Sequence, residues 1–171
     1  MTNKEFFIQT WQGEMPRTLN AINGLPADMS KLGYQCDEKA RSAAALISHF
    51  LAHAEVMDNS TENFIANENS AVTQFASKED AANYFEKHAT SVVEKLKAVD
   101  DNTWEGQIVD FQVDGNSLFA YPMLNIFWML MFDMIHHRGQ LSTYYRHMGV
   151  RNPSIYGPTA EDMEAMAAAQ N

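Results

Sequence analysis

The sequence predicts an all-α fold, a four-helix bundle, with a short β-hairpin or extended excursion before the last long helix. Apolar side chains recur about every 3.6 residues in four long segments, which is typical of amphipathic helices. Ahead of the last segment, residues 107–113 alternate apolar and polar side chains instead, and Asp114 and Gly115 follow as a turn signal. The chain has 171 residues, so we expect a single domain over residues 1–171.

The start and stop signals of the helices agree with this periodicity. The expected helices cover residues 3–22, 39–63, 77–99 and 122–148, and a weaker helical end covers 161–169. Ser77 is a good N-cap for the third helix, and Asp80 follows three residues later in a pattern like a capping box. Pro122 suits the first position of the fourth helix, and Gly149 is expected to end it.

The fourth helix is apolar on nearly every side. The side chains of Trp128 and Ile135 cannot share one helical stripe with Leu130. A helix that is apolar all round is normally buried all round. We therefore expect a homodimer that packs through this last long helix.

Composition limits the partners and the compartment. The net charge of −10 disfavours binding to nucleic acid or to an anionic membrane, since both are polyanions. Residues 118–132 are apolar but too short to span a bilayer. The single cysteine, Cys36, cannot form an internal disulfide, and the first residues lack the plan of a signal peptide. We expect a cytoplasmic protein.

The most informative polar residues lie inside the most apolar segment. Asp133 and His137 are four residues apart, so on a helix they lie on the same face. His49 and His53 interrupt the apolar stripe of the second helix in the same way. Buried polar groups need partners. The residues alone allow two interpretations, a divalent cation shared by two facing helices or a mutually hydrogen-bonded Asp133–His137 pair without metal.

Three stretches of the chain carry a family resemblance: residues 136–146 (HHRGQLSTYYR), residues 153–158 (PSIYGP) and residues 46–49 (LISH). In these stretches, and in the order of helices over nearly the whole chain, the sequence resembles the DinB family. The resemblance implies a four-helix metal protein whose ion is held by one histidine of the second helix and a His-x-x-x-His pair of the fourth. In this sequence those positions are His49, Asp133 and His137, with Asp133 standing where the family commonly has histidine.

The resemblance also implies a chemistry. Two histidines and one carboxylate would bind a divalent ion such as Zn, Ni, Mn or Fe, and the carboxylate favours the harder of these ions. Three protein ligands leave an open position, where the ion lowers the pKa of water to about 7 or holds a thiol as thiolate. Family members with assigned activity include transferases and isomerases that use low-molecular-weight thiols. We therefore expect a small-molecule substrate, with such a thiol as one candidate.

Three functions remain open on the sequence. The preferred one is a metal-dependent transferase or hydrolase that activates water or a small thiol, with His53 as a supporting partner or a catalytic proton shuttle. The second is a non-catalytic stress-response or binding module with a structural or vestigial metal site. The third is a purely structural dimer in which Asp133 and His137 pair with each other.

Three remaining features carry simpler expectations. His88 is expected at the surface. Tyr156, Gly157 and Pro158 are expected to form a turn that folds the tail over the bundle, with a lid over the metal as the alternative. Arg138 is expected to form structural salt bridges to a neighbouring helix.

Overall fold

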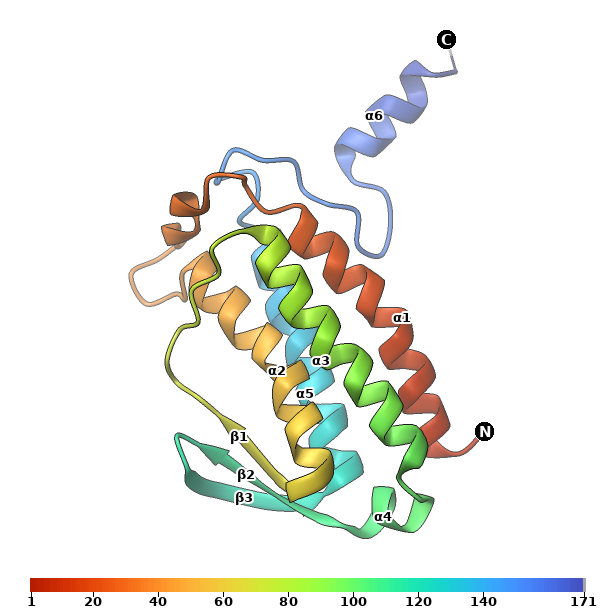
Figure 1. Ribbon diagram of the computed structural model, residues 1–171. Helices are drawn as coiled ribbons and strands as arrows, with labels where there is room; N and C mark the ends of the chain where they lie inside the picture. Colours follow the sequence, from red (N-terminus) through yellow and green to blue (C-terminus); the bar gives the residue numbers. More distant parts are fainter. Residues whose placement is uncertain (171) are drawn as a thin grey trace.

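Four long helices build the protein in the computed structural model, which describes residues 1–170 (Figure 1). They are α1 (Asn3–Asn23), α2 (Ala43–Asn63), α3 (Lys78–Ala98) and α5 (Met123–Ser142). Helix α2 packs against both α3 and α5, and α1 packs against α3 and α5. The bundle therefore brings α2 and α5 side by side, as the metal hypothesis requires.

Side-chain caps fix where these helices begin. The Thr2 hydroxyl and the Glu5 carboxylate form a reciprocal capping box at the start of α1. Ser42 caps α2, so this helix begins at Ala43 and not at residue 39 as predicted. Ser77 caps α3 by accepting a hydrogen bond from the Asp80 N–H, as the sequence predicts.

A three-stranded sheet makes the fold helix-rich but not all-α, which corrects the predicted class. Strand β1 (Ile65–Glu68) pairs in parallel with β2 (Ile108–Val113), which pairs antiparallel with β3 (Asn116–Pro122). The predicted hairpin is β2–β3, and its turn places Asp114 and Gly115 at positive φ. Strand β1 was not predicted, because it has only four residues and buries only Ala66.

Two short helices complete the connections between the larger elements. Helix α4 (Asp101–Gly106) follows α3 and buries Trp104, and the 3-10 helix η1 (Met29–Gly33) lies between α1 and α2. The sequence prediction contained neither of them. Both are too short to show a hydrophobic period.

Helix α5 ends six residues earlier than predicted, at Ser142 instead of 148. The hydroxyls of Ser142 and Thr143 donate to the carbonyls of Gly139 and Gln140, which competes with continued helix. Turns follow up to Gly149, whose φ of +77° ends this region. Helix α6 (Ala160–Ala168) then extends away from the bundle and buries none of its residues (Figure 1).

The interior of the bundle is mostly apolar, and a buried ion pair between Arg138 and Glu14 lies inside it. Phe7, Trp11, Trp104 and Phe127 are fully buried; Phe7 stacks on Trp11, and Phe7, Trp104 and Phe127 contact one another edge-on or tilted. Arg138 is 1% exposed and donates to Glu14 on α1, so the expected structural salt bridge is present. Within the described residues, no helix combines the length and the apolar character needed to cross a membrane.

Candidate metal centre

The candidate site lies between α2 and α5. His49 and His53 are one turn apart on α2, and Asp133 and His137 are one turn apart on α5. The facing turns bring all four side chains together. Strand β1 adds Glu68 behind the two histidines of α2, because the chain turns back along this helix after Phe64 adopts a left-handed conformation.

Three imidazoles converge on one carboxylate oxygen. Asp133 Oδ2 lies 2.8 Å from His53 Nε2, 3.1 Å from His49 Nε2 and 3.3 Å from His137 Nε2. The His49 ring centroid is 4.7 Å from the centroids of both other rings. Donor atoms of His49, His53 and Asp133 all lie within 4.8 Å of one another, which is close enough to share one ion.

Outer contacts orient the rings so that Nε2 faces the centre. Glu68 Oε1 lies 3.2 Å from His53 Nδ1, and Glu68 Oε2 lies 3.9 Å from His49 Nδ1. His137 Nδ1 lies 2.7 Å from Gln140 Oε1. A carboxylate or amide oxygen behind a ring is the usual outer partner of a metal-binding histidine, because it holds the Nδ1 proton and leaves Nε2 free. His53 Nδ1 is nevertheless not aligned for a hydrogen bond to any of the described residues.

His137 has a defined tautomer. Arg41 Nη1 lies 3.0 Å from His137 Nε2, and a guanidinium can only donate. His137 Nε2 is therefore an acceptor without a proton, and Nδ1 donates to Gln140. Nε2 of His137 also lies 3.3 Å from the carboxylate oxygen of Asp133. Both atoms are possible metal ligands, so a cation close to them would be attracted by both.

The electrostatics keep a negative charge at the centre. Partial burial raises the pKa of Asp133, but hydrogen bonds from the His49 and His53 imidazoles and the charge of His53 lower it by more, so it lies well below the ordinary 3.8. Burial lowers the pKa of His53, but Asp133 and Glu68 raise it by more, so it lies above the ordinary 6.5. Asp133 is therefore ionised at neutral pH and available as a ligand.

The donor set fits a divalent ion. A tetrahedral ion with bonds of about 2.1 Å separates its ligand atoms by roughly 3.4 Å. The three separations from Asp133 Oδ2, 2.8 Å, 3.1 Å and 3.3 Å, are at or below this value, so an ion would push His53 outward the most. Imidazole nitrogen with carboxylate oxygen is also a donor set that Zn, Mn, Fe and Ni accept.

The centre is open on two sides. A hollow of about 430 Å³, here called the basic pocket, is lined by Cys36, Lys39, Arg41, His137, Gln140 and Tyr144 among others. A second hollow of about 260 Å³ reaches His49 and Glu68, and Arg41 lines both hollows. The Asp133 side chain is 38% exposed, whereas His53 is fully buried. A small molecule can therefore approach the centre without displacing the core.

The structure places the sequence-predicted residues as follows. Of the expected ligands, His49 and Asp133 form a group with His53 whose donor atoms all lie within 4.8 Å of one another, and His137 lies beside this group, 3.3 Å from Asp133 Oδ2. The outer residues Glu68 and Arg41 were missed. Glu68 falls in a stretch without periodicity, so only the unpredicted strand β1 brings it to the site.

Two secondary expectations are wrong or changed. His88 is buried, not at the surface, because its Nδ1 bonds Asp58 Oδ2 at 2.8 Å. Tyr156 does not cover the metal ligands. Its hydroxyl contacts Glu14 and Arg138 at the α1–α5 junction, which fits the turn that folds the tail over the bundle.

The sequence model of the DinB family matches residues 1–171. The chain belongs to the DinB family. The family membership that the sequence resemblance implied is thereby confirmed. Comparison with curated proteins finds no match.

Two solved structures share the DinB fold of this chain. A DinB-like protein of Bacillus cereus superposes with a TM-score of 0.69 at 22% identity, covering 89% of this chain and 97% of its own. A DinB-like protein of Bacillus subtilis superposes with a TM-score of 0.63 at 18% identity, covering 90% of this chain and 99% of its own. At these identities the likeness establishes the fold of this DinB protein, and its chemistry must be argued from the site.

Proposed function

We propose that this DinB protein is a metal-dependent enzyme of the transferase or hydrolase type, which activates water or a low-molecular-weight thiol for attack on a small electrophilic molecule. One divalent ion, Zn, Ni, Mn or Fe, is held by His49, Asp133 and His137. The observation that carries the proposal is the convergence of three imidazole Nε2 atoms on Asp133 Oδ2, at 2.8 Å, 3.1 Å and 3.3 Å. Such an ion acts as a Lewis acid that lowers the pKa of the attacking group.

We infer that His53 is a fourth donor to this ion and not a proton shuttle. Its Nε2 makes the shortest of the three contacts with Asp133, 2.8 Å, and its Nδ1 faces Glu68. The ring is fully buried, so it has no direct contact with water through which to exchange protons. Four protein donors fill a tetrahedral ion but leave open positions on an ion that takes five or six ligands.

The same donor count supports a second candidate, a non-catalytic stress-response or binding module with a structural or vestigial metal site. Closed tetrahedral sites are typically structural. The two hollows beside the centre favour the enzyme instead, because a purely structural site needs no approach for a second molecule. Turnover that is lost with a chelator and restored by metal would decide for the enzyme. Tight metal binding without turnover, in a screen of thiol-transfer and hydrolysis reactions, would decide for the module.

Metal titration of untagged, chelator-treated protein tests the site itself. We expect one equivalent of Zn²⁺ per chain in the wild type and in His136→Ala, whose side chain is exposed at the position just before His137 on α5. In His137→Ala we expect the affinity to fall by at least about a hundredfold, since losing even an outer partner costs up to that much. Circular dichroism checks that the fold is kept. Stoichiometric, equally tight binding by His137→Ala would refute the assignment.

His53→Ala separates the two roles of that residue. If His53 is a donor to the ion, this variant loses metal affinity as His137→Ala does. If His53 only carries protons, the variant keeps the ion at wild-type affinity and loses turnover. The second result would overturn the inference about His53 while leaving the metal site in place.

A further inference from the structure

Arg41 is a cation at the centre of the site without an acidic partner. Among the described residues, no carboxylate pairs with it, although the chain carries twenty-two acidic residues against twelve basic ones. Each of the other arginines is paired: Arg17 and Arg138 with Glu14, Arg146 with Glu161, and Arg151 with Asp162. An exposed arginine that stays unpaired in so acidic a protein is available to an external anion.

The fold holds the backbone of Arg41 at this place. The Tyr144 hydroxyl donates to the Arg41 carbonyl at 3.2 Å, and the next residue, Ser42, caps α2. The side chain then reaches the centre, where Nη1 donates to His137 Nε2 at 3.0 Å. The positive end of the α2 dipole lies at the same point and also favours an anion.

The surroundings of Arg41 offer room and a second positive charge. Arg41 lines both hollows, so it stands between them at the approach to the metal ligands. Lys39 lines the basic pocket and forms no ion pair within residues 1–170. A small anion in the basic pocket would therefore meet a guanidinium, an ammonium group nearby, and the candidate ion.

The present contact of Arg41 cannot persist when metal binds. His137 Nε2 has one lone pair in the ring plane, and Arg41 now uses it. A cation bound to that nitrogen takes the same lone pair and repels the guanidinium. Arg41 is then released next to the ion, where it needs a new acceptor.

We propose that Arg41 anchors the substrate by a carboxylate, so that the site selects small molecules with an anionic group beside the atom that the ion activates. This inference rests on the proposed metal-dependent function. Because Nη1 lies 3.0 Å from a ligand atom, a molecule that reaches the ion through one atom reaches Arg41 with a carboxylate only a few bonds away. The planar guanidinium matches the two oxygens of a carboxylate.

Thiol probes of different charge test the anchor. The Co²⁺-loaded protein is titrated with mercaptoacetate and with neutral 2-mercaptoethanol, and binding is followed by the sulfur-to-cobalt absorption. In Arg41→Gln we expect the Kd of mercaptoacetate to rise about tenfold, as the loss of a charged hydrogen bond predicts. The Kd of 2-mercaptoethanol should change by less than about twofold, since it carries no charge. Mercaptoacetate can also chelate an ion, which would raise its affinity without Arg41. The test therefore compares the Kd of each probe between the wild type and Arg41→Gln, and not the Kd values of the two probes.

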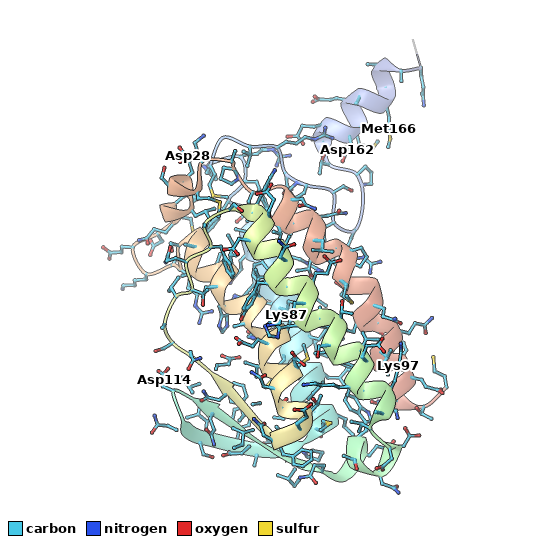
Figure 2. The ribbon with its side chains drawn as sticks, in the orientation of Figure 1. Asp28, Lys87, Lys97, Asp114, Asp162 and Met166 are labelled. Atoms are coloured by element: carbon cyan, nitrogen blue, oxygen red, sulfur yellow. The ribbon has the colours of Figure 1, made fainter. Side chains whose placement is uncertain are left out.

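A charge-matched control excludes a general field effect. Lys87→Gln changes the net charge equally, and Lys87 is exposed on α3, a helix that does not belong to the site (Figure 2). We expect this variant to bind both probes as the wild type does. Equal losses of both probes in Arg41→Gln, or an unchanged Kd for mercaptoacetate, would overturn the anchor and leave the metal site standing. Failure of the wild type to bind Co²⁺ would overturn the proposed function and the anchor with it.

Discussion

At the scale of single residues, the centre is defined by one ionised carboxylate surrounded by imidazole nitrogens. Asp133 is ionised, and Arg41 and Gln140 fix the tautomer in which Nε2 of His137 carries no proton. The sequence alone singles out Asp133 and His137, because polar side chains at helical spacing inside an apolar segment need polar partners. Arg41 and Glu68 were not predictable, because their positions depend on a cap and a short strand that carry no periodic signal.

Glu68 should tune the metal affinity from outside. Replacing it by glutamine in Glu68→Gln removes the charge that faces His53 Nδ1 at 3.2 Å. We expect metal affinity to fall about 10–100-fold, because such outer carboxylates raise the basicity of the ligand. Competition with a chelator of known affinity measures the change. Glu62→Gln, at an exposed position of α2, is the control and should bind as the wild type. Equal metal affinity in both variants would show that Glu68 does not tune the metal site.

Asp58 should make stability depend on pH. Burial raises its pKa, but hydrogen bonds from Ser91, His88 and Lys95 lower it by more, so the folded pKa lies below the ordinary 3.8. A depressed carboxyl pKa stabilises the fold above the unfolded pKa, and this stability is lost as the pH falls through the folded value.

The variant Asp58→Asn removes that dependence. We expect the free energy of unfolding at pH 7 to fall by about 1–3 kcal/mol, because the ionised acceptor is lost. Below the unfolded pKa of 3.8 the difference from the wild type should shrink. Urea unfolding at both pH values measures it. A constant difference across this range would contradict the role of ionisation.

At the scale of elements, one buried ion pair joins α1 to α5. Arg138 donates to Glu14 at 2.5 Å, and both side chains are at least nine-tenths buried.

Long helices with clear caps, such as α3, were predictable from local chemistry, and the hairpin was predictable from its turn residues. The end of α5 was not, because the hydroxyls of Ser142 and Thr143 stop the helix while the apolar period continues toward Met148.

Removing one member of that pair should be costly. Arg138→Met leaves the Glu14 carboxylate buried without its main partner, and we expect a loss of about 3–5 kcal/mol in unfolding free energy. The double variant Glu14→Leu/Arg138→Met removes both charges and should recover most of this loss. Denaturant unfolding compares them. A double variant no more stable than Arg138→Met would contradict this explanation.

At the scale of the whole molecule, α5 is not fully covered within one chain. Phe132 is 59% exposed and stacks on Trp128 at 5.5 Å between ring centroids, and Trp128 contacts Phe6. The sequence predicted a helix apolar on every side, and the bundle leaves this aromatic face to solvent. We propose that a second copy of the chain covers it in a homodimer, as two-fold pairing of identical faces is the commonest assembly.

Phe132→Glu tests this assembly. A charge on the aromatic face should abolish pairing, because a carboxylate buried there has no partner. Light scattering after size exclusion should give a dimer for the wild type and a monomer for the variant. Leu118→Glu, at an exposed apolar position on the β2–β3 hairpin, is the control and should remain a dimer. A monomeric wild type at all concentrations would contradict the proposal.

The central claim is that one metal ion sits where three imidazoles and one carboxylate of α2 and α5 converge. Anomalous X-ray scattering from crystals of untagged protein, purified without chelators, tests it most directly. We expect a single strong peak between Asp133 Oδ2 and the Nε2 atoms of His49, His53 and His137. No peak at that point, or a peak bound to other residues, would contradict it.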